Sequence, residues 1–269
     1  MRLQKLSNNL RFSIIKMSNS TKSPHLASSL SCVDIVTTLY QSILKFKNSN
    51  PRWDFRDRFI LSKGHAALAL YVMLAYKNII TEEELQSYCK FGSLLEEHPS
   101  PKLPGIEAAT GSLGHGLPIG CGIALSSKIK KKNYMTYVLM SDGECNEGSV
   151  WEAALFASAK NLNNLCAFVD YNKWQATGKT KEILKLDSLM KKFREFGWNV
   201  LEIDGHDHKL IIESCKIAIN EKSKPTMIIA NTIKGKGVSF MENDNNWHYR
   251  IPSIEEVKLA KKELNINEK

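Results

Sequence analysis

Two apolar segments of the chain run directly into polar residues that can bind a cation. The first leads into Asp142 and Gly143, and the second leads into Asn172. Asp142 and Asn172 are 30 positions apart, about the length of one strand–helix–strand unit. Because a right-handed parallel crossover places both strand ends at the same edge of a sheet, we expect the two side chains to converge there. Open α/β sheets bind their ligands at this edge.

The donor types at these positions indicate a hard cation. Carboxylate and amide oxygens suit Mg²⁺ or Ca²⁺ rather than zinc or copper, and Mg²⁺ commonly completes its coordination with water and phosphate oxygens. Gly143 would let a phosphate approach the backbone, and the following helix N-terminus favours an anion. The pattern predicts a metal-bridged phosphate site. The alternative is that Asp142 caps a helix and Asn172 shapes a turn.

Histidines form the second group of candidate residues. Five of them lie in polar segments flanked by Gly or Pro: His25, His65, His98, His115 and His248. Imidazole groups donate hydrogen bonds to phosphate and move protons near pH 7. A single loop histidine is more often a surface residue, and we expect this of His206 and His208.

The surrounding elements must place these residues at one sheet edge. Strands are expected at 58–61, 134–140, 165–170, 198–203 and 226–230. Helices are expected at 3–17, 31–46, 66–77, 120–131, 150–160, 186–196 and 209–220, with a loop at 18–30. Ser253 and Glu256 form a capping box for a last helix. The Gly- and Pro-rich stretch 92–118 reads as a functional loop. This alternation predicts an α/β fold in which helices flank a parallel sheet.

Composition limits the class of protein. The chain has 269 residues, 43% of them hydrophobic, and a formal net charge of +9, so a soluble globular domain spanning residues 1–269 is expected. The lysines are scattered, and the cluster Lys128 with 130–132 reads as a solvated helix end, so nucleic-acid binding is not expected. Six cysteines without a CxxC pair indicate reduced thiols. The start lacks the apolar core of a secretory signal, and no apolar run is long enough to span a membrane, so we expect a cytoplasmic protein.

Several segments together carry a family resemblance. Residues 141–143 with Asn172 resemble the thiamine diphosphate motif, with Ser141 in place of its usual first Gly. Further segments, in order, resemble transketolase: 57–66 around His65, Glu97-His98-Pro99, the cofactor loop 109–116, and 232–237 followed by Trp247-His248. The resemblance spans roughly residues 20–250. The chain is far shorter than full-length transketolases and resembles the N-terminal, diphosphate-binding half that split transketolases encode separately.

The resemblance implies roles for individual residues. Asp142, Asn172 and the backbone carbonyl of Trp174 would hold the metal. The cofactor would contact His65, Gly111, Leu113, Gly143, Glu147, Asn172 and His248. The catalytic residues would be His25, His98 and His248. Glu147 and Glu152 would be carboxylates at a contact between chains, or otherwise charges that favour a helix terminus. His115 would face the cofactor or a neighbouring chain.

The resemblance also implies an activity and a partner. A two-carbon ketol unit would pass from a ketose phosphate to an aldose acceptor in pentose phosphate metabolism. Thiamine diphosphate and Mg²⁺, with Ca²⁺ or Mn²⁺ as possible replacements, would be required. A separately encoded C-terminal subunit would complete a heterotetramer with two copies of each chain. The alternatives are a subunit like deoxyxylulose phosphate synthase or a 2-oxo acid dehydrogenase, and a non-catalytic relic of the fold. Pro24 and Tyr249 depart from the family pattern beside two of the histidines.

Overall fold

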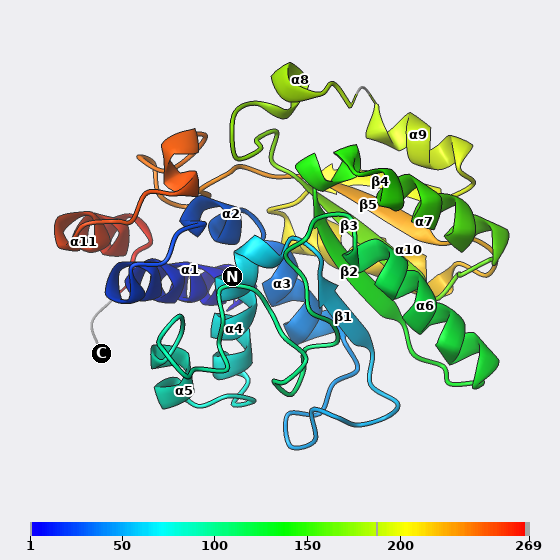
Figure 1. Ribbon diagram of the computed structural model, residues 1–269, viewed down its shortest axis with the longest axis horizontal. Coiled ribbons are helices and arrows are strands. Elements are labelled where there is room, and N and C mark those ends of the chain that lie inside the picture. The colour runs from blue at the N-terminus through cyan, green and yellow to red at the C-terminus, as the bar shows by residue number, and fades with distance from the viewer. Residues whose placement is uncertain (1, 187, 267–269) are drawn as a thin grey trace.

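Five parallel strands form the sheet that the alternation of strands and helices predicted. The computed structural model describes residues 2–186 and 188–266, and the expected domain 1–269 extends beyond them at both ends. The strands are β1 (Arg58–Leu61), β2 (Thr136–Ser141), β3 (Leu165–Tyr171), β4 (Asn199–Asp204) and β5 (Thr226–Asn231). Their order across the sheet is β1-β2-β3-β5-β4, with every neighbouring pair parallel (Figure 1). All five carboxyl ends therefore lie along one edge.

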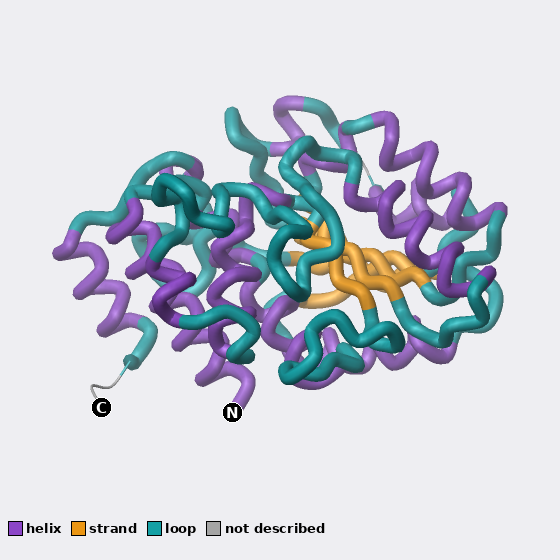
Figure 2. The backbone as a smooth tube through the Cα atoms, turned by 60° about the horizontal axis from the view of Figure 1, so that its bottom comes forward, coloured by secondary structure: helices purple, strands orange, loops and turns teal. Residues whose placement is uncertain are grey.

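Helices cover both faces of the sheet (Figures 1 and 2). On one face lie α1 (Arg2–Thr21), α2 (Leu26–Ser31), α3 (Val33–Thr38), α4 (Ala67–Tyr76) and α10 (His208–Asn220). On the other lie α6 (Gly116–Ile129), α7 (Gly148–Ala159) and α9 (Leu189–Glu195). α5 (Glu82–Gln86) and α8 (Thr180–Ile183) are short, and α11 (Ile254–Glu263) packs on α1.

Strand β2 shows why the sheet has two cores. All six of its residues are buried, and side chains alternate between faces along a strand. Tyr137 and Leu139 enter the core beneath α1 to α4, whereas Val138 and Met140 enter the core beneath α6 and α7. A strand that is buried on both faces has a continuous run of apolar residues. This run is why β2 could be predicted from the sequence.

The predicted strands and most helices are confirmed within two or three residues at each end. The capping box at Ser253 and Glu256 is present, and α6 begins at Gly116, four positions before the expected start. The expected helix 186–196 corresponds to α9, and residue 187 within it lies outside the described residues. No helix in the described part of the chain is long and apolar enough to cross a membrane.

Two predictions in the first fifty residues were wrong. The segment 18–30 is not one loop, because α1 continues to Thr21 and α2 begins at Leu26. Every residue of α2 is buried, so packing overrides the weak helix propensity of its serines. The expected helix 31–46 is interrupted near Cys32 and ends in a wider π turn over Leu39–Ile43.

The contact between α6 and β2 generates a stability prediction. A Cβ atom on Gly120 would lie 2.5 Å from Cγ2 of the buried Val138, whereas a Cβ on Gly122 would meet no described atom within 4 Å. We expect Gly120→Ala to lower the free energy of unfolding by about 1–3 kcal/mol. Gly122→Ala should leave it unchanged or raise it by up to about 1 kcal/mol, because Ala favours the helix.

Urea unfolding of the purified chain measures both variants. Gly122→Ala is the matched control, since it makes the same substitution two positions along the same helix. Equal effects of the two substitutions would contradict the close packing of α6 on β2.

Candidate active site

The carboxyl edge of the sheet carries a polar residue after each strand. β1 leads into Lys63 and His65, β2 into Asp142, β3 into Asn172, and β5 into Lys234. A cavity of about 470 Å³ opens over this edge. Its wall includes most of the residues predicted from the sequence: His25, His65, His98, Gly111, Leu113, Gly143, Asn172, Trp174 and His248.

The ends of β2 and β3 converge as their spacing predicted. Asp142 Oδ2 accepts hydrogen bonds from the Lys173 amide at 2.9 Å and from Thr180 Oγ1 at 2.8 Å. Its Oδ1 accepts from the Gly143 amide at 2.9 Å, and Asn172 Oδ1 accepts from the Trp174 amide at 3.0 Å. Asp142 therefore caps the next turn and Asn172 shapes a loop, as the alternative interpretation held. Carbonyl and carboxylate oxygens have two lone pairs each, so these bonds still leave acceptor capacity for a cation.

The surroundings of Asp142 suit a cation bound together with a phosphate. Burial raises the pKa of Asp142 to about 6, against partial compensation from its hydrogen bond with Thr180. A bound cation would stabilise the charged carboxylate. Gln175 Nε2 is buried at the cavity wall and has no partner among the described residues, so it can donate to an anion. The donor set therefore fits a hard metal ion bridged to a phosphate.

Four histidines from separate segments form one cluster at the cavity. The His25 ring lies in the middle, with its centroid 4.9 Å from that of His248, 5.5 Å from that of His65 and 6.5 Å from that of His98. His25 has a φ of +63°, a strained conformation for a residue other than glycine. Its amide donates to the His248 carbonyl at 2.8 Å, and its Nδ1 lies 3.0 Å from Glu97 Oε1.

Loop 109–116 closes against this cluster at Gly111. Gly111 has a φ of +137°, and a Cβ atom there would lie 2.4 Å from Cδ2 of His98. Only glycine fits this position, because it must both adopt a left-handed conformation and let the His98 ring approach the backbone. The position of the His98 ring therefore depends on a glycine in the expected cofactor loop.

Three of the clustered imidazoles, those of His25, His65 and His248, are neutral near pH 7. Burial lowers the pKa of His25, of His65 and of His248, the last to about 3. The Lys234 ammonium adds to the effect at His248, and the Lys63 ammonium adds to it at His65. A neutral imidazole has one donor and one acceptor nitrogen, so these side chains can pass protons between substrate atoms.

The direction of the proton on His248 follows from its neighbours. Lys234 Nζ lies 3.3 Å from His248 Nδ1, and an ammonium can only donate. Nδ1 is therefore the acceptor, and neutral His248 carries its proton on Nε2. Lys234 is held in place by Asn245 Oδ1 at 2.6 Å and by the Gln175 carbonyl at 3.3 Å.

Three buried charged residues of the site were not predicted as site residues. Lys63 and Asp170 are fully buried and form an ion pair, and Lys234 is 1% exposed. Lys63 and Lys234 lie within motifs that the sequence analysis used, next to a glycine in each case. Asp170 interrupts the apolar residues at the end of β3, and a charge in such a run is itself a signal of a buried partner.

Other predicted residues lie apart from the cavity wall. Glu147 and Glu152 are exposed at the start and on the outer face of α7, and His115 is exposed just before α6. The expectation that His206 and His208 are surface residues was wrong. Their side chains are only 12% and 13% exposed, because both turn inward onto the buried carboxylate of Asp34.

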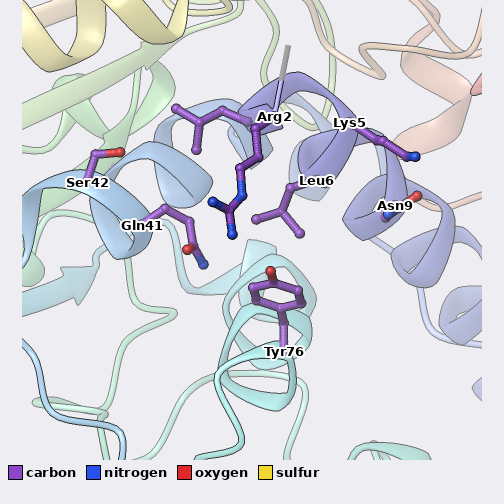
Figure 3. A pocket seen from close by; sticks show the side chains of 8 residues that line it. Arg2, Lys5, Leu6, Asn9, Gln41, Ser42 and Tyr76 are labelled. Atoms are coloured by element: carbon purple, nitrogen blue, oxygen red, sulfur yellow. The ribbon is translucent and has the colours of Figure 1, made fainter.

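A second hollow, of about 600 Å³, lies between the start of α1 and the end of α4. Figure 3 shows Arg2, Gln41 and Tyr76 pointing toward one another across it. Helix α4 begins two residues after His65 and ends at Tyr76. At 1.5 Å per residue the helix is about 15 Å long, so the second hollow lies about one helix length from His65. The described lining of the second hollow contains no histidine or carboxylate. We therefore assign the candidate active site to the cavity over the sheet edge.

Comparison with known proteins defines the class. The family described as "Transketolase, thiamine diphosphate binding domain" matches residues 3–269. Solved transketolases from Pichia stipitis and Campylobacter jejuni each superpose with a TM-score of 0.93 at 29% identity, covering 99% and 98% of this chain. The chain therefore belongs to the transketolase family and corresponds to the thiamine diphosphate-binding domain of that family.

Its length corresponds to one type of chain within that family. An apulose-4-phosphate transketolase subunit of Phocaeicola vulgatus is 41% identical over 93% of this chain and 89% of its own length. The 6-deoxy-6-sulfo-D-fructose transketolase subunit SqwG of a Clostridium species is 41% identical over 89% of this chain and 88% of its own length. Human transketolase is 39% identical over 91% of this chain, which spans 39% of that protein. The chain is thus of the N-terminal type found in split transketolases.

The contact between Lys234 and His248 generates a prediction. Because the ammonium disfavours a charged imidazole, Lys234→Met should raise the pKa of His248 from about 3. The pKa should stay below the ordinary value of about 6.5, since burial persists. NMR titration of the His248 ring measures the shift. Lys236→Met is the matched control, because Lys236 pairs with Glu242 at 3.4 Å outside the cavity. An unchanged His248 titration in Lys234→Met would contradict the contact.

Proposed function

We propose that the chain is the N-terminal subunit of a two-chain transketolase that moves a two-carbon ketol unit from a ketose phosphate to an aldose acceptor. One observation carries the proposal: the cavity joins Gly143 and Asn172, at the ends of β2 and β3, to a cluster of four histidines. We propose that residues 1–269 act as one diphosphate-binding domain, with Mg²⁺ as the metal and the cytoplasm as the compartment.

We propose the following division of roles among the cavity residues. Asp142, Asn172 and the Trp174 carbonyl would hold the metal, and Gly143 would leave room for the diphosphate. The cofactor, when bound, supplies a nucleophilic carbon that forms and breaks carbon–carbon bonds. His65, Gly111, Leu113, Glu147 and His248 would orient it.

Proton transfer would fall to histidines at the opening of the cavity. His25 and His98 come from different loops and both line the wall, so they can reach different substrate hydroxyls. His248 would donate from Nε2, because its Nδ1 faces Lys234. Tyr249 lies over this group, with its ring centroid 4.7 Å from that of His248 and 5.7 Å from that of His25. We propose that Tyr249 narrows the way in for the sugar and so contributes to its selection.

The substrate class follows from the related proteins only as a proposal. The names of two relatives refer to apulose 4-phosphate and to 6-deoxy-6-sulfo-D-fructose, which are both sugars with an anionic terminal group. The cations near this cavity, Lys63 and Lys234, are buried and do not line its wall. We propose that the partner chain supplies the groups that bind the anionic end of the sugar.

Exposed apolar side chains support a partner. Helices α6 and α7 pack side by side and expose Ile119, Leu155 and Phe156. The preceding irregular segment exposes Phe91 and Leu94. Exposed apolar side chains commonly mark a protein interface where they form a patch. We propose that the C-terminal subunit covers this surface in a heterotetramer, and that Glu147, Glu152 and His115 lie at the contact.

Reconstitution tests the function. The chain alone, with Mg²⁺ and thiamine diphosphate, should transfer no two-carbon unit between sugar phosphates. Adding the separately encoded C-terminal subunit should restore transfer, and light scattering should give a mass equal to two copies of each chain. Activity of this chain alone would contradict the requirement for a partner. Inactivity of the assembled complex across ketose phosphate donors would contradict the transketolase assignment.

The metal assignment has its own test. Asp142→Asn keeps the shape of the side chain and removes the charge, so it should weaken Mg²⁺-dependent thiamine diphosphate binding by about 100-fold or more. Calorimetry on the two-chain complex measures the affinity. Asp54→Asn is the control, because Asp54 is an exposed carboxylate paired with Lys132. Equal affinity of the Asp142→Asn and unmodified complexes would contradict metal binding by Asp142.

A further inference from the structure

His206 is the polar side chain that follows β4 at the carboxyl edge, yet it does not line the cavity. It lies in the turn between β4 and α10 and touches two elements from distant parts of the chain. Its Nδ1 lies 2.8 Å from Asp34 Oδ2, and its Nε2 accepts a hydrogen bond from the Ile233 amide at 2.9 Å.

These contacts define one tautomer. A backbone amide can only donate, so Nε2 carries no proton, and the proton of the neutral ring is on Nδ1 and points to Asp34. Asp34 is itself fixed by Arg11, whose Nη1 and Nη2 lie 3.0 Å and 2.5 Å from the two carboxylate oxygens. Arg11 and Asp34 are each 1% exposed, so this pair is a rigid support for the His206 ring.

The segment that receives the His206 contact is held closely on both sides. The Gly205 amide donates to the Asn231 carbonyl at 2.8 Å, and the Gly235 amide donates to the Ala27 carbonyl at 3.0 Å. A Cβ atom on Gly205 would lie 2.5 Å from Cγ2 of Thr232, so the β4–α10 turn must approach this segment without a side chain. Between Asn231 and Gly235, the Ile233 amide donates its hydrogen bond to His206.

The residues on either side of Ile233 belong to the candidate site. Thr232 Oγ1 donates to the buried carboxylate of Asp170, and Lys234 Nζ contacts His248 Nδ1. Lys234 begins a turn in which the Lys236 amide donates to the Ile233 carbonyl at 3.2 Å. Ile233 joins this turn to Thr232, so the orientation of its peptide helps to set where Thr232 and Lys234 point.

We propose that His206 is a positioning residue for the active site: supported by Asp34 and Arg11, it holds the Ile233 amide so that Lys234 faces His248. The proposal gives α1 and the β4–α10 turn a role in catalysis although neither lines the cavity. It builds on the proposed function, but the geometry that it describes can be measured in the chain without cofactor or partner.

Two isosteric substitutions separate the two contacts of the ring. In His206→Gln the side-chain oxygen can take the place of Nε2 and accept from Ile233, while the contact of Nδ1 with Asp34 is lost. In His206→Asn the side-chain nitrogen can take the place of Nδ1, while the acceptor for Ile233 is lost. If His206 positions Lys234, His206→Asn should raise the pKa of His248 toward its value in Lys234→Met, and His206→Gln should retain most of the original value.

The measurements are NMR titration of the His248 ring in the chain and calorimetry of Mg²⁺–thiamine diphosphate binding to the two-chain complex. His206→Asn should weaken that binding by about 10-fold, with partial recovery in His206→Gln. Thr38→Val is the matched control, because it removes the 2.7 Å contact with His208 Nδ1 from the same polar group without touching Ile233. It should lower the melting temperature and leave the His248 titration unchanged.

Three results would overturn the proposal. One is a nitrogen spectrum of the unmodified chain that places the His206 proton on Nε2, which needs no variant to fold. Another is an unchanged His248 titration in His206→Asn. The third is an equal His248 shift in Thr38→Val, which would show that loss of stability alone explains the effect. A failure of the proposed function would appear differently, as a complex that transfers no ketol unit while the His248 titrations follow the expected order.

Discussion

The structure depends most on the buried ion pair between Lys63 and Asp170. Both side chains are fully buried, and they link the ends of β1 and β3 across the intervening β2. Lys63 Nζ also donates to the Ser28 carbonyl at 2.9 Å, and Asp170 accepts from Ser31 Oγ at 2.6 Å and from Thr232. One pair thus connects α2, β1, β3 and the segment after β5. Because desolvation opposes such a pair, its value lies less in stability than in requiring one arrangement of these four elements.

The same buried charges determine the protonation of the histidines. Lys63 and Lys234 lie beneath the cluster, and their positive charges act in the same direction as burial at His65 and His248. Imidazoles that would be partly charged near pH 7 in water are therefore neutral here. The chemistry of the upper part of the site thus follows from ions that do not face the cavity opening.

Every strand of the sheet contributes to this edge, but not in the same way. β1, β2, β3 and β5 each end in a residue whose side chain meets the cavity or its floor. β4, at one edge of the sheet, is followed by His206, whose ring accepts from the Ile233 amide just after β5 and does not line the cavity. The order β1-β2-β3-β5-β4 accounts for the difference, since β4 lies at the end of the sheet away from β1, β2 and β3, which are followed by the cavity residues His65, Gly143 and Asn172.

The sequence alone determined the strands, the parallel α/β class and the convergence of the segments after β2 and β3, where the Lys173 amide next to Asn172 donates to Asp142. These features depend on short-range patterns, such as apolar runs and the length of one strand–helix–strand unit, which survive without knowledge of distant contacts. Recognition of His25, His65, His98 and His248 also came from local motifs. Their grouping around one ring, with His25 at φ +63°, came only from the fold. The motifs name residues, but they contain no distances between segments more than two hundred positions apart.

Tertiary structure alone decided the pairing of Lys63 with Asp170, the inward turn of His206 and His208, and the existence of α2. Each of these runs against a local preference: charged residues favour solvent, loop histidines are usually exposed, and serine-rich segments usually form turns. The fold overrides these preferences by supplying a partner for each buried polar group, as Asp34 does for the two histidines. A buried partner is a property of the folded chain, because it comes from a segment that the local sequence does not specify.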